Sequence, residues 1–501
     1  MDTDPKLLKP LVPNLLALMP RLFYFTFSMV LIAVTLHKIG TKYTFGTNEG
    51  WNAYWASAAW TGLDLYPASS SFRLNNYVPL WFYFTGALGA MVGDIIRAGR
   101  FLASLALFLN AVAICCIVRE ITGRTQDCWF AGVAFLSLFC LFYEDYVAIN
   151  EPQIAANLFM TASSLIFIRQ IGNDSRTSTY PILVSCLLIG GLIKQNVLAV
   201  PISIFIFLMF HDRPALVRFV GFSFVGISIA CALLYVAFGR NIFASLLFPR
   251  RYDIAIALTQ TRGQLANYSL FLPLIAISHF AFKSNPKEKF VLIYLFVGFA
   301  QGLIFSGGFD VDINVFFDFA IATAILLGLA HNFTIRTIGN VNVDYRRKIH
   351  LVAALTIGLL VPPALSFHSW SDDLSREFSV DATAQDVDLV YLNAMTGHVM
   401  CENLALCYWS GKRFEVDVVN LKALILAQPD LETLIVGRIN TCSYSLIQLS
   451  ENWDNDEYDG PFTERIRNAL NDHYTMAKET TSGIYRVPFR CSPGLTFYDG
   501  H

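Results

Sequence analysis

The feature of this 501-residue sequence that most constrains its fold is a series of about eleven apolar runs, each close to membrane-spanning length. A helix needs roughly 20 apolar residues to cross a bilayer. Only 15% of the residues are charged, whereas a soluble domain usually carries about 25%. We therefore predict an α-helical polytopic membrane protein with about 11 transmembrane helices. The apolar runs cover approximately 22–38, 97–118, 128–143, 152–168, 179–193, 196–211, 217–238, 265–282, 290–306, 313–331 and 349–366.

Basic residues indicate which helix ends share a side of the membrane. Lys and Arg are absent from the short loops 144–151 and 306–312, and they are frequent in loops 119–127, 169–178, 212–218, 283–289 and 332–348. The positive-inside rule therefore puts the N-terminus in the cytoplasm and makes the short run 78–93 a surface or re-entrant helix. Residues 1–20 show no small-residue cleavage site, so the first run is expected to stay as an anchor.

The sequence changes character at about residue 367, where charged residues become frequent. With eleven spans, residues 1–366 form the membrane domain and residues 367–501 lie outside. Helices are expected near 416–427 and 462–475, and apolar stretches such as 434–437 and 483–487 alternate with charged residues. This pattern predicts a small extracytoplasmic α/β domain.

Four of the ten cysteines, Cys401, Cys407, Cys442 and Cys491, lie in this C-terminal part. An even number fits disulfides in an oxidising compartment, and it also fits four unpaired thiols. Cys401 with Cys407 and Cys442 with Cys491 are plausible pairs among the three connectivities that four cysteines allow. The other six cysteines lie in apolar runs and are expected to be ordinary membrane-core residues.

The long outer loop 39–96 carries the first candidate site residue, Glu49. A loop of this length is uncommon unless it is functional. Its many Trp and Tyr residues are typical of the headgroup region, where aromatic side chains anchor helices. Glu49 follows the first span directly, so it is either a general base beside the membrane or an acid that favours the start of a helix.

Two further outer segments carry charged residues close to the membrane. Glu151 immediately precedes a span and is either functional or part of a solvated capping loop. Arg250 and Arg251 lie where topology disfavours basic residues, and they either bind a lipid phosphate or anchor the chain among headgroups. Lys194 lies between two spans at their outer end, and an ionisable residue at that depth is a functional candidate.

The order of these features resembles the GT-C glycosyltransferases that use polyprenyl-phosphate sugars. More narrowly, it resembles the bacterial family related to protein mannosyltransferases and aminoarabinose transferases, over roughly residues 20–366. The family usually has an acidic pair where this chain has Asn48-Glu49, and a Pro-Pro-Leu segment where it has Val78-Pro-Leu. The segment 307–318 resembles a Gly…Asn…acid segment of related bacterial members.

The resemblance implies a membrane glycosyltransferase (hexosyl- or pentosyltransferase) of the bacterial inner membrane. It would move a sugar from a polyprenyl-phosphate donor to an envelope glycan, lipid or protein acceptor on the outer face. The implied catalytic residues are Glu49, as general base, and Glu151, as its alternate. The implied ligands of the donor phosphate are the basic residues Arg97, Arg100, Lys194, Arg250 and Arg251. The implied substrate cavity is lined by the polar residues Asn48, Asn52, Tyr54, Asn76, Tyr77, Asn314 and Asp318.

No cofactor or metal is expected, because the lipid-linked sugar is itself the donor. The sequence has no Gly-rich nucleotide loop, its nine histidines do not cluster, and its net charge of −2 gives no sign of nucleic-acid binding. The strongest rival is a transporter or flippase for a lipid-linked sugar; a polymer ligase and a ligand-binding scaffold or sensor also stay open. Transporters commonly have internal repeats and broken helices at mid-membrane, whereas the polar outliers here gather in loops at one face.

Overall fold

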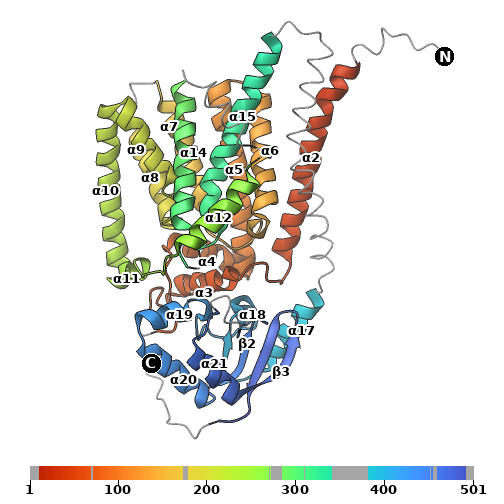
Figure 1. Ribbon diagram of the computed structural model, residues 1–501, viewed down its shortest axis with the longest axis vertical. Helices are drawn as coiled ribbons and strands as arrows, with labels where there is room; N and C mark the ends of the chain where they lie inside the picture. The colour runs from red at the N-terminus through yellow and green to blue at the C-terminus, as the bar shows by residue number, and fades with distance from the viewer. Residues whose placement is uncertain are drawn as a thin grey trace, which may run out of the picture.

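The computed structural model describes residues 11–68, 71–172, 179–269, 271, 285–309, 311–340, 382–451, 453–454 and 460–491. The predicted span 349–366 and most of the predicted span 265–282 lie outside the described residues. The chain forms a helical bundle at one end and a mixed domain at the other, with two short helices between them (Figure 1).

The bundle confirms the predicted polytopic membrane fold. Among the described residues, five helices are long and apolar enough to cross a membrane: Ile95–Thr122, Thr125–Phe142, Arg213–Phe238, Pro286–Phe305 and Ile313–Phe333. Helix α10 leaves Val217, Phe224 and Val236 more than 70% exposed, as expected for side chains that face lipid. The helices of the bundle are α2 (Leu11–Gly40), α5 (Ile95–Thr122), α6 (Thr125–Phe142), α7 (Gln153–Gln170), α8 (Thr179–Ile193), α9 (Ala199–His211), α10 (Arg213–Phe238), α14 (Pro286–Phe305) and α15 (Phe317–Asn340).

Short elements at the end of the bundle near the C-terminal domain position the polar residues. Helix α3 (Asn48–Thr61) and helix α4 (Leu80–Val92) lie between the bundle and that domain (Figure 1). Helix α4 has 13 residues and lies within the run 78–93 that was predicted as a surface or re-entrant helix. The other short elements are η1 (Glu144–Tyr146), α11 (Asn241–Leu246), α12 (Ile254–Asn267) and η2 (Ile313–Phe316).

The C-terminal domain is α/β, as predicted. Its four-stranded sheet has the order β1-β2-β4-β3, in which β1 is parallel to β2 and the other neighbours are antiparallel. The predicted helices at 416–427 and 462–475 correspond to α19 and α21, and the stretch 434–437 lies in helix α20, not in a strand. The elements are α17 (Ala382–Ala394), β1 (His398–Cys401), α18 (Leu404–Trp409), α19 (Val418–Ala427), α20 (Asp430–Asn440), β2 (Tyr444–Leu449), α21 (Glu464–His473), β3 (Tyr474–Thr480) and β4 (Gly483–Pro488).

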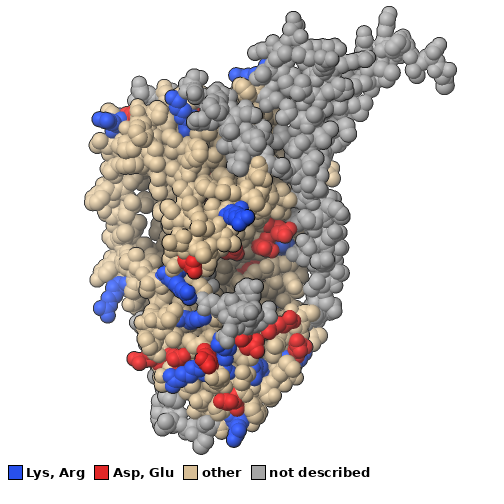
Figure 2. Space-filling model, in the orientation of Figure 1, with Lys and Arg blue, Asp and Glu red and all other residues tan. Residues whose placement is uncertain are grey.

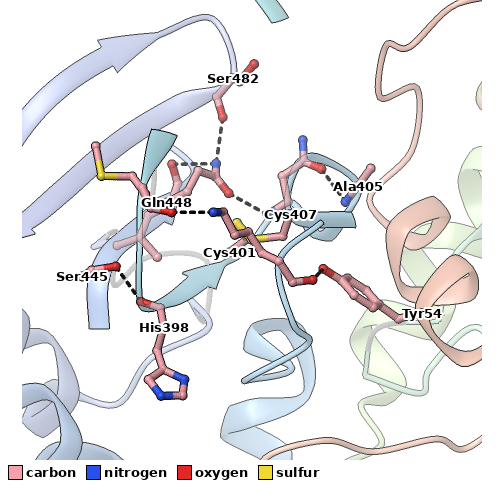
Figure 3. Close-up of a disulfide and its surroundings, with 12 residues drawn as sticks. Tyr54, His398, Cys401, Ala405, Cys407, Ser445, Gln448 and Ser482 are labelled. Atoms are coloured by element: carbon pink, nitrogen blue, oxygen red, sulfur yellow. Dashed lines mark hydrogen bonds between the residues drawn. A yellow bond between two sulfur atoms is a disulfide. The ribbon is translucent and has the colours of Figure 1, made fainter. Parts of the chain in front are cut away.

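Both predicted disulfides are confirmed, Cys401 with Cys407 and Cys442 with Cys491. The first closes the loop that leads from β1 into α18 (Figure 3). Gln448 of β2 supports the same loop, because its side chain accepts a hydrogen bond from the Asn403 backbone at 2.9 Å. The loop is therefore held by a covalent bond and by the sheet.

Candidate active site at the end of the bundle

Glu49 and Arg100 form a fully buried ion pair between α3 and α5. Arg100 donates from Nε to Oε1 of Glu49 at 2.7 Å and from Nη2 to Oε2 at 2.6 Å, and both side chains are 0% exposed. The remaining donors of Arg100 reach the backbone carbonyls of Lys38, Thr41 and Tyr43. Bidentate pairs of this kind are strong and geometrically specific, so Arg100 fixes the chain between α2 and α3.

The Glu49 carboxylate accepts hydrogen bonds at all of its acceptor sites. Its Oε1 also accepts from the Asn150 backbone at 3.0 Å, and its Oε2 accepts from the Phe45 backbone at 3.2 Å. An ionised carboxylate has about four acceptor sites, and four bonds are made here. An acceptor hydroxyl would therefore have to displace an existing partner before Glu49 could take its proton.

Asn150 connects several elements, and no motif in the sequence indicates this role. Its side chain donates to the Glu49 carbonyl at 3.3 Å and accepts from the Trp81 indole at 3.2 Å, while its carbonyl accepts from Asn52 at 2.7 Å. A Cβ on Gly99 would lie 1.9 Å from Oδ1 of Asn150, so a glycine at this position of α5 makes room for the amide. These contacts join residues about one hundred positions apart, which no local pattern indicates.

Glu151 and Lys194 form a second buried ion pair, next along the chain from Asn150. The Lys194 Nζ lies 2.7 Å from Oε1 of Glu151, and the two side chains are 5% and 4% exposed. Oε2 of Glu151 accepts from the Gln153 backbone at 2.6 Å. The Lys194 ammonium also lies over the Tyr77 ring, 3.7 Å from its centroid, a cation–π contact. Each oxygen of Glu151 accepts one hydrogen bond, in contrast to two for each oxygen of Glu49.

The other predicted cavity residues are distributed between the bundle and the domain interface. Asn76 adjoins the Lys194 loop, because its carbonyl accepts from Gln195 at 2.6 Å. Asn48 is exposed at the start of α3, and Asn314 is half-buried in η2. Tyr54 lies at the interface with the C-terminal domain: its hydroxyl donates to the Lys412 carbonyl at 2.6 Å, and its ring contacts those of Tyr408 and Phe414.

Asp318 differs from its predicted place in a substrate cavity. The side chain is 0% exposed and accepts from the Tyr294 hydroxyl at 2.7 Å and from Gln301 at 3.3 Å. Gln301 in turn accepts from the Leu198 backbone at 2.9 Å, just after the loop that carries Lys194. A buried carboxylate needs such partners, so Asp318 supports the position of this loop from inside the bundle.

The predicted phosphate ligands do not all lie together. One cavity of about 320 Å³ is lined by Arg250, Arg251 and Asn76. Arg100 is committed to Glu49, and Arg97 donates to the Gly40 carbonyl at 2.7 Å at the end of α2. No group of three or more metal-ligating side chains occurs within the part of the chain that the structure describes.

The C-terminal domain packs directly against α3. A Cβ on Gly50 would lie 2.0 Å from the Ala405 backbone nitrogen, so α3 and the α18 loop meet backbone to backbone. The Trp51 indole donates to Asp417 at 3.0 Å. On α5, Asp94 accepts from the Trp409 indole at 3.0 Å. The residue that follows Glu49 is thus a docking point for the domain.

Gly50→Ala is therefore expected to weaken docking by about 1–3 kcal/mol, the usual effect of overpacking a close contact. Limited proteolysis of the full-length protein in detergent should release the C-terminal domain faster. Gly191→Ala in α8 is a matched control, because its added Cβ meets nothing within 4 Å. Equal cleavage rates for the two variants would contradict the close contact at Gly50.

The carboxyl of Asp417 makes this interface sensitive to pH. Burial raises the pKa of Asp417 from 3.8 to about 6, against opposing hydrogen bonds from Asn420 and Trp51. Because the folded protein binds this proton more tightly than the unfolded chain, its stability should fall as the pH rises from about 4 to about 6. The difference in pKa corresponds to about 3 kcal/mol.

Asp417→Asn should remove this pH-dependent contribution, which can be measured from melting temperatures at about pH 4.5 and about pH 7. The unmodified protein is expected to lose more stability between the two pH values than the variant does. An identical change in both proteins would show that Asp417 is not the titrating group.

The fold defined by these elements is shared with solved structures of two other membrane proteins. ArnT from Cupriavidus metallidurans is similar in its apo state (TM-score 0.64) and bound to undecaprenyl phosphate (TM-score 0.63), both at 12% identity. These alignments cover 94% and 92% of this chain and 98% and 97% of the ArnT chains.

An Archaeoglobus fulgidus oligosaccharyltransferase tethered with an acceptor peptide is similar over 92% of this chain and 74% of its own, with a TM-score of 0.51 and 11% identity. No protein-family model matches the chain, and no curated protein sequence does. The relationship is therefore one of fold.

Proposed function

We propose that this protein is a membrane glycosyltransferase that moves a sugar from a polyprenyl-phosphate donor to a hydroxyl of a glycan, lipid or protein acceptor. The observation that carries the proposal is the buried Glu151–Lys194 pair at the end of a GT-C bundle. A carboxylate and a cation within one hydrogen bond supply the two functions that this reaction needs: a base for the acceptor and a positive charge for the leaving phosphate.

The proposed reaction is a direct displacement at the sugar. The acceptor oxygen bonds to C1 of the sugar while the bond from C1 to the phosphate oxygen breaks, and polyprenyl phosphate leaves with the electron pair. A carboxylate takes the hydroxyl proton. Lys194 would turn from Glu151 toward the phosphate, and this exchange would also free Glu151 to act as the base.

Glu151 and Glu49 are both candidates for the base. Glu151 is held by one cation and one backbone amide, whereas Glu49 is held by a bidentate guanidinium and two backbone amides. The smaller number of bonds to be broken favours Glu151 as the base and Glu49 as the group that positions α3. Arg250 and Arg251 would hold the donor phosphate.

The reaction would take place on the extracytoplasmic face of a bacterial inner membrane. Helix α5 begins beside the C-terminal domain, where the Ile95 backbone donates to Tyr408, so its basic C-terminal end at Arg119 lies at the far end of the bundle (Figure 1). The positive-inside rule puts that far end in the cytoplasm. The two disulfides support an oxidising compartment for the C-terminal domain.

Transfer from lipid-linked sugars in liposomes tests the proposal. The purified protein is mixed with a panel of labelled undecaprenyl-phosphate sugars and with envelope glycan, lipid and protein fractions. We expect label to move to one fraction as undecaprenyl phosphate is released. If labelled donor crosses between leaflets with its sugar–phosphate bond intact in every mixture, the protein is a flippase and the proposal fails.

A further inference from the structure

The cavity lined by Arg250 and Arg251 has a wall that comes from the C-terminal domain. Its lining comes from the loop between α11 and α12, from Leu74, Asn76 and Phe309, and from helix α19. The cavity thus lies where the bundle and the domain meet. Figure 2 shows Lys and Arg side chains, interspersed with Asp and Glu, at the level where the bundle and the C-terminal domain meet.

The lining suits an amphiphile that carries a phosphate. Arg250, Arg251 and, from α19, Lys422 are the charged side chains among the described residues that line it, and Asn76 and Asn420 add amides. Guanidinium and ammonium groups bind phosphate oxygens by charge-assisted hydrogen bonds. The rest of the lining is apolar, and it includes Phe248, Phe309 and Leu426. A volume of about 320 Å³ is at the lower end of the range for small-ligand sites, enough for a headgroup and the first part of a chain.

Helix α19 is held firmly in this position. Asp417, its N-cap, accepts from the Asn420 backbone at 3.2 Å and from the Trp51 indole of α3 at 3.0 Å. The Asp417 backbone also donates to the Phe72 carbonyl at 2.9 Å, in the segment that continues to the lining of the cavity. The start of helix α19 is therefore held against α3 and the segment at Phe72. The Lys422 Nζ itself donates to the Gly460 carbonyl at 3.5 Å, a long bond that a phosphate would replace.

The cavity also adjoins the buried ion pair. The carbonyl of Asn76, which lines the cavity, accepts from Gln195 at 2.6 Å, and Gln195 follows Lys194 directly. Tyr77, the next residue after Asn76, carries the ring under the Lys194 ammonium. The segment Asn76-Tyr77 thus connects the cavity with the proposed reaction centre.

We infer that helix α19 of the C-terminal domain completes the lipid-phosphate site, with Lys422 as a phosphate ligand together with Arg250 and Arg251. The inference rests on the proposed function, because it assigns the site to polyprenyl phosphate. It gives the C-terminal domain a direct part in donor binding.

Binding of undecaprenyl phosphate to the full-length protein in nanodiscs tests this without any knowledge of the sugar. Lys422→Ala is expected to raise the Kd by about tenfold or more, the effect of one lost hydrogen bond to a charged group, and Lys422→Arg should retain most of the affinity. Arg465→Ala is the matched control, since Arg465 is 55% exposed on α21 of the same domain and does not line the cavity. Lys422→Gln is the second variant if Lys422→Ala does not fold.

Binding and competition measurements with undecaprenol, inorganic phosphate and phosphatidylglycerol vesicles distinguish the possible ligands. Undecaprenol should bind weakly, and neither free phosphate nor phosphatidylglycerol should compete at similar concentrations. If Arg250→Ala weakens binding and Lys422→Ala does not, the role of α19 is wrong and the proposed function stands. If the unmodified protein does not bind undecaprenyl phosphate, or binds undecaprenol equally well, both the inference and the donor class of the proposed function are wrong.

Discussion

Arg100→Ala is expected to destabilise the folded protein by about 3–5 kcal/mol, the usual effect of removing one partner from a buried ion pair. The variant leaves the Glu49 carboxylate buried without its guanidinium. It also leaves the carbonyls of Lys38 and Thr41 without the donor that they share. Equilibrium unfolding in mixed micelles, followed by tryptophan fluorescence, measures the loss.

Arg97→Ala is the matched control on the same helix. Arg97 is 38% exposed, lies 3.7 Å from Asp94 and donates to the Gly40 carbonyl at 2.7 Å. An exposed pair contributes about 0–1 kcal/mol and a single hydrogen bond about 0.5–1.5 kcal/mol, so the expected loss is smaller than for Arg100→Ala. Adding Glu49→Gln to Arg100→Ala should recover part of the lost stability, because the double variant no longer buries an unpaired charge. Equal effects of Arg97→Ala and Arg100→Ala would show that the buried pair does not stabilise the junction of α2, α3 and α5.

Elements that depend on local pattern could be predicted well from the sequence. The apolar run 179–193 coincides with α8, and the predicted helix 462–475 contains α21. Membrane helices are specified by a long apolar composition that few other structures share. The stretch 434–437 illustrates the limit of this approach, since a short apolar segment fits a helix as well as a strand, and here it forms part of α20.

The sequence predicts where the site residues lie better than it predicts which residues they contact. The sequence predicts Glu49, Glu151 and Lys194 as polar residues at one end of the bundle, and in the structure all three lie in buried ion pairs at the end near the C-terminal domain. It did not indicate that Asn150 would join the two ion pairs or that Asp318 would be enclosed by α14. The place of a polar residue within an apolar sequence indicates how deep in the membrane it lies. The residue with which it pairs depends on contacts between segments far apart in sequence.

Glu151→Gln is expected to lower sugar transfer by about 10²–10⁴-fold, the contribution of a general base. Glutamine keeps an oxygen for the Gln153 amide but cannot take a proton from the acceptor. The variant should not lose affinity for undecaprenyl phosphate, because Lys194 is released from its carboxylate partner at 2.7 Å and stays available to the phosphate. Low transfer with retained donor binding separates a lost base from a misfolded protein.

Glu49→Gln distinguishes the two carboxylates in the same liposome assay. Because Glu49 is saturated by four hydrogen bonds, its replacement should act mainly by weakening the Arg100 contact, and stability and transfer should fall together. Lys194→Ala should behave differently again, with weaker binding of undecaprenyl phosphate as well as slower transfer. If Glu49→Gln is as stable as the unmodified protein and inactive while Glu151→Gln is active, Glu49 is the base. That result would require the Arg100 guanidinium or a backbone amide to release Glu49 when the acceptor binds, and it would move the proton transfer to the start of α3.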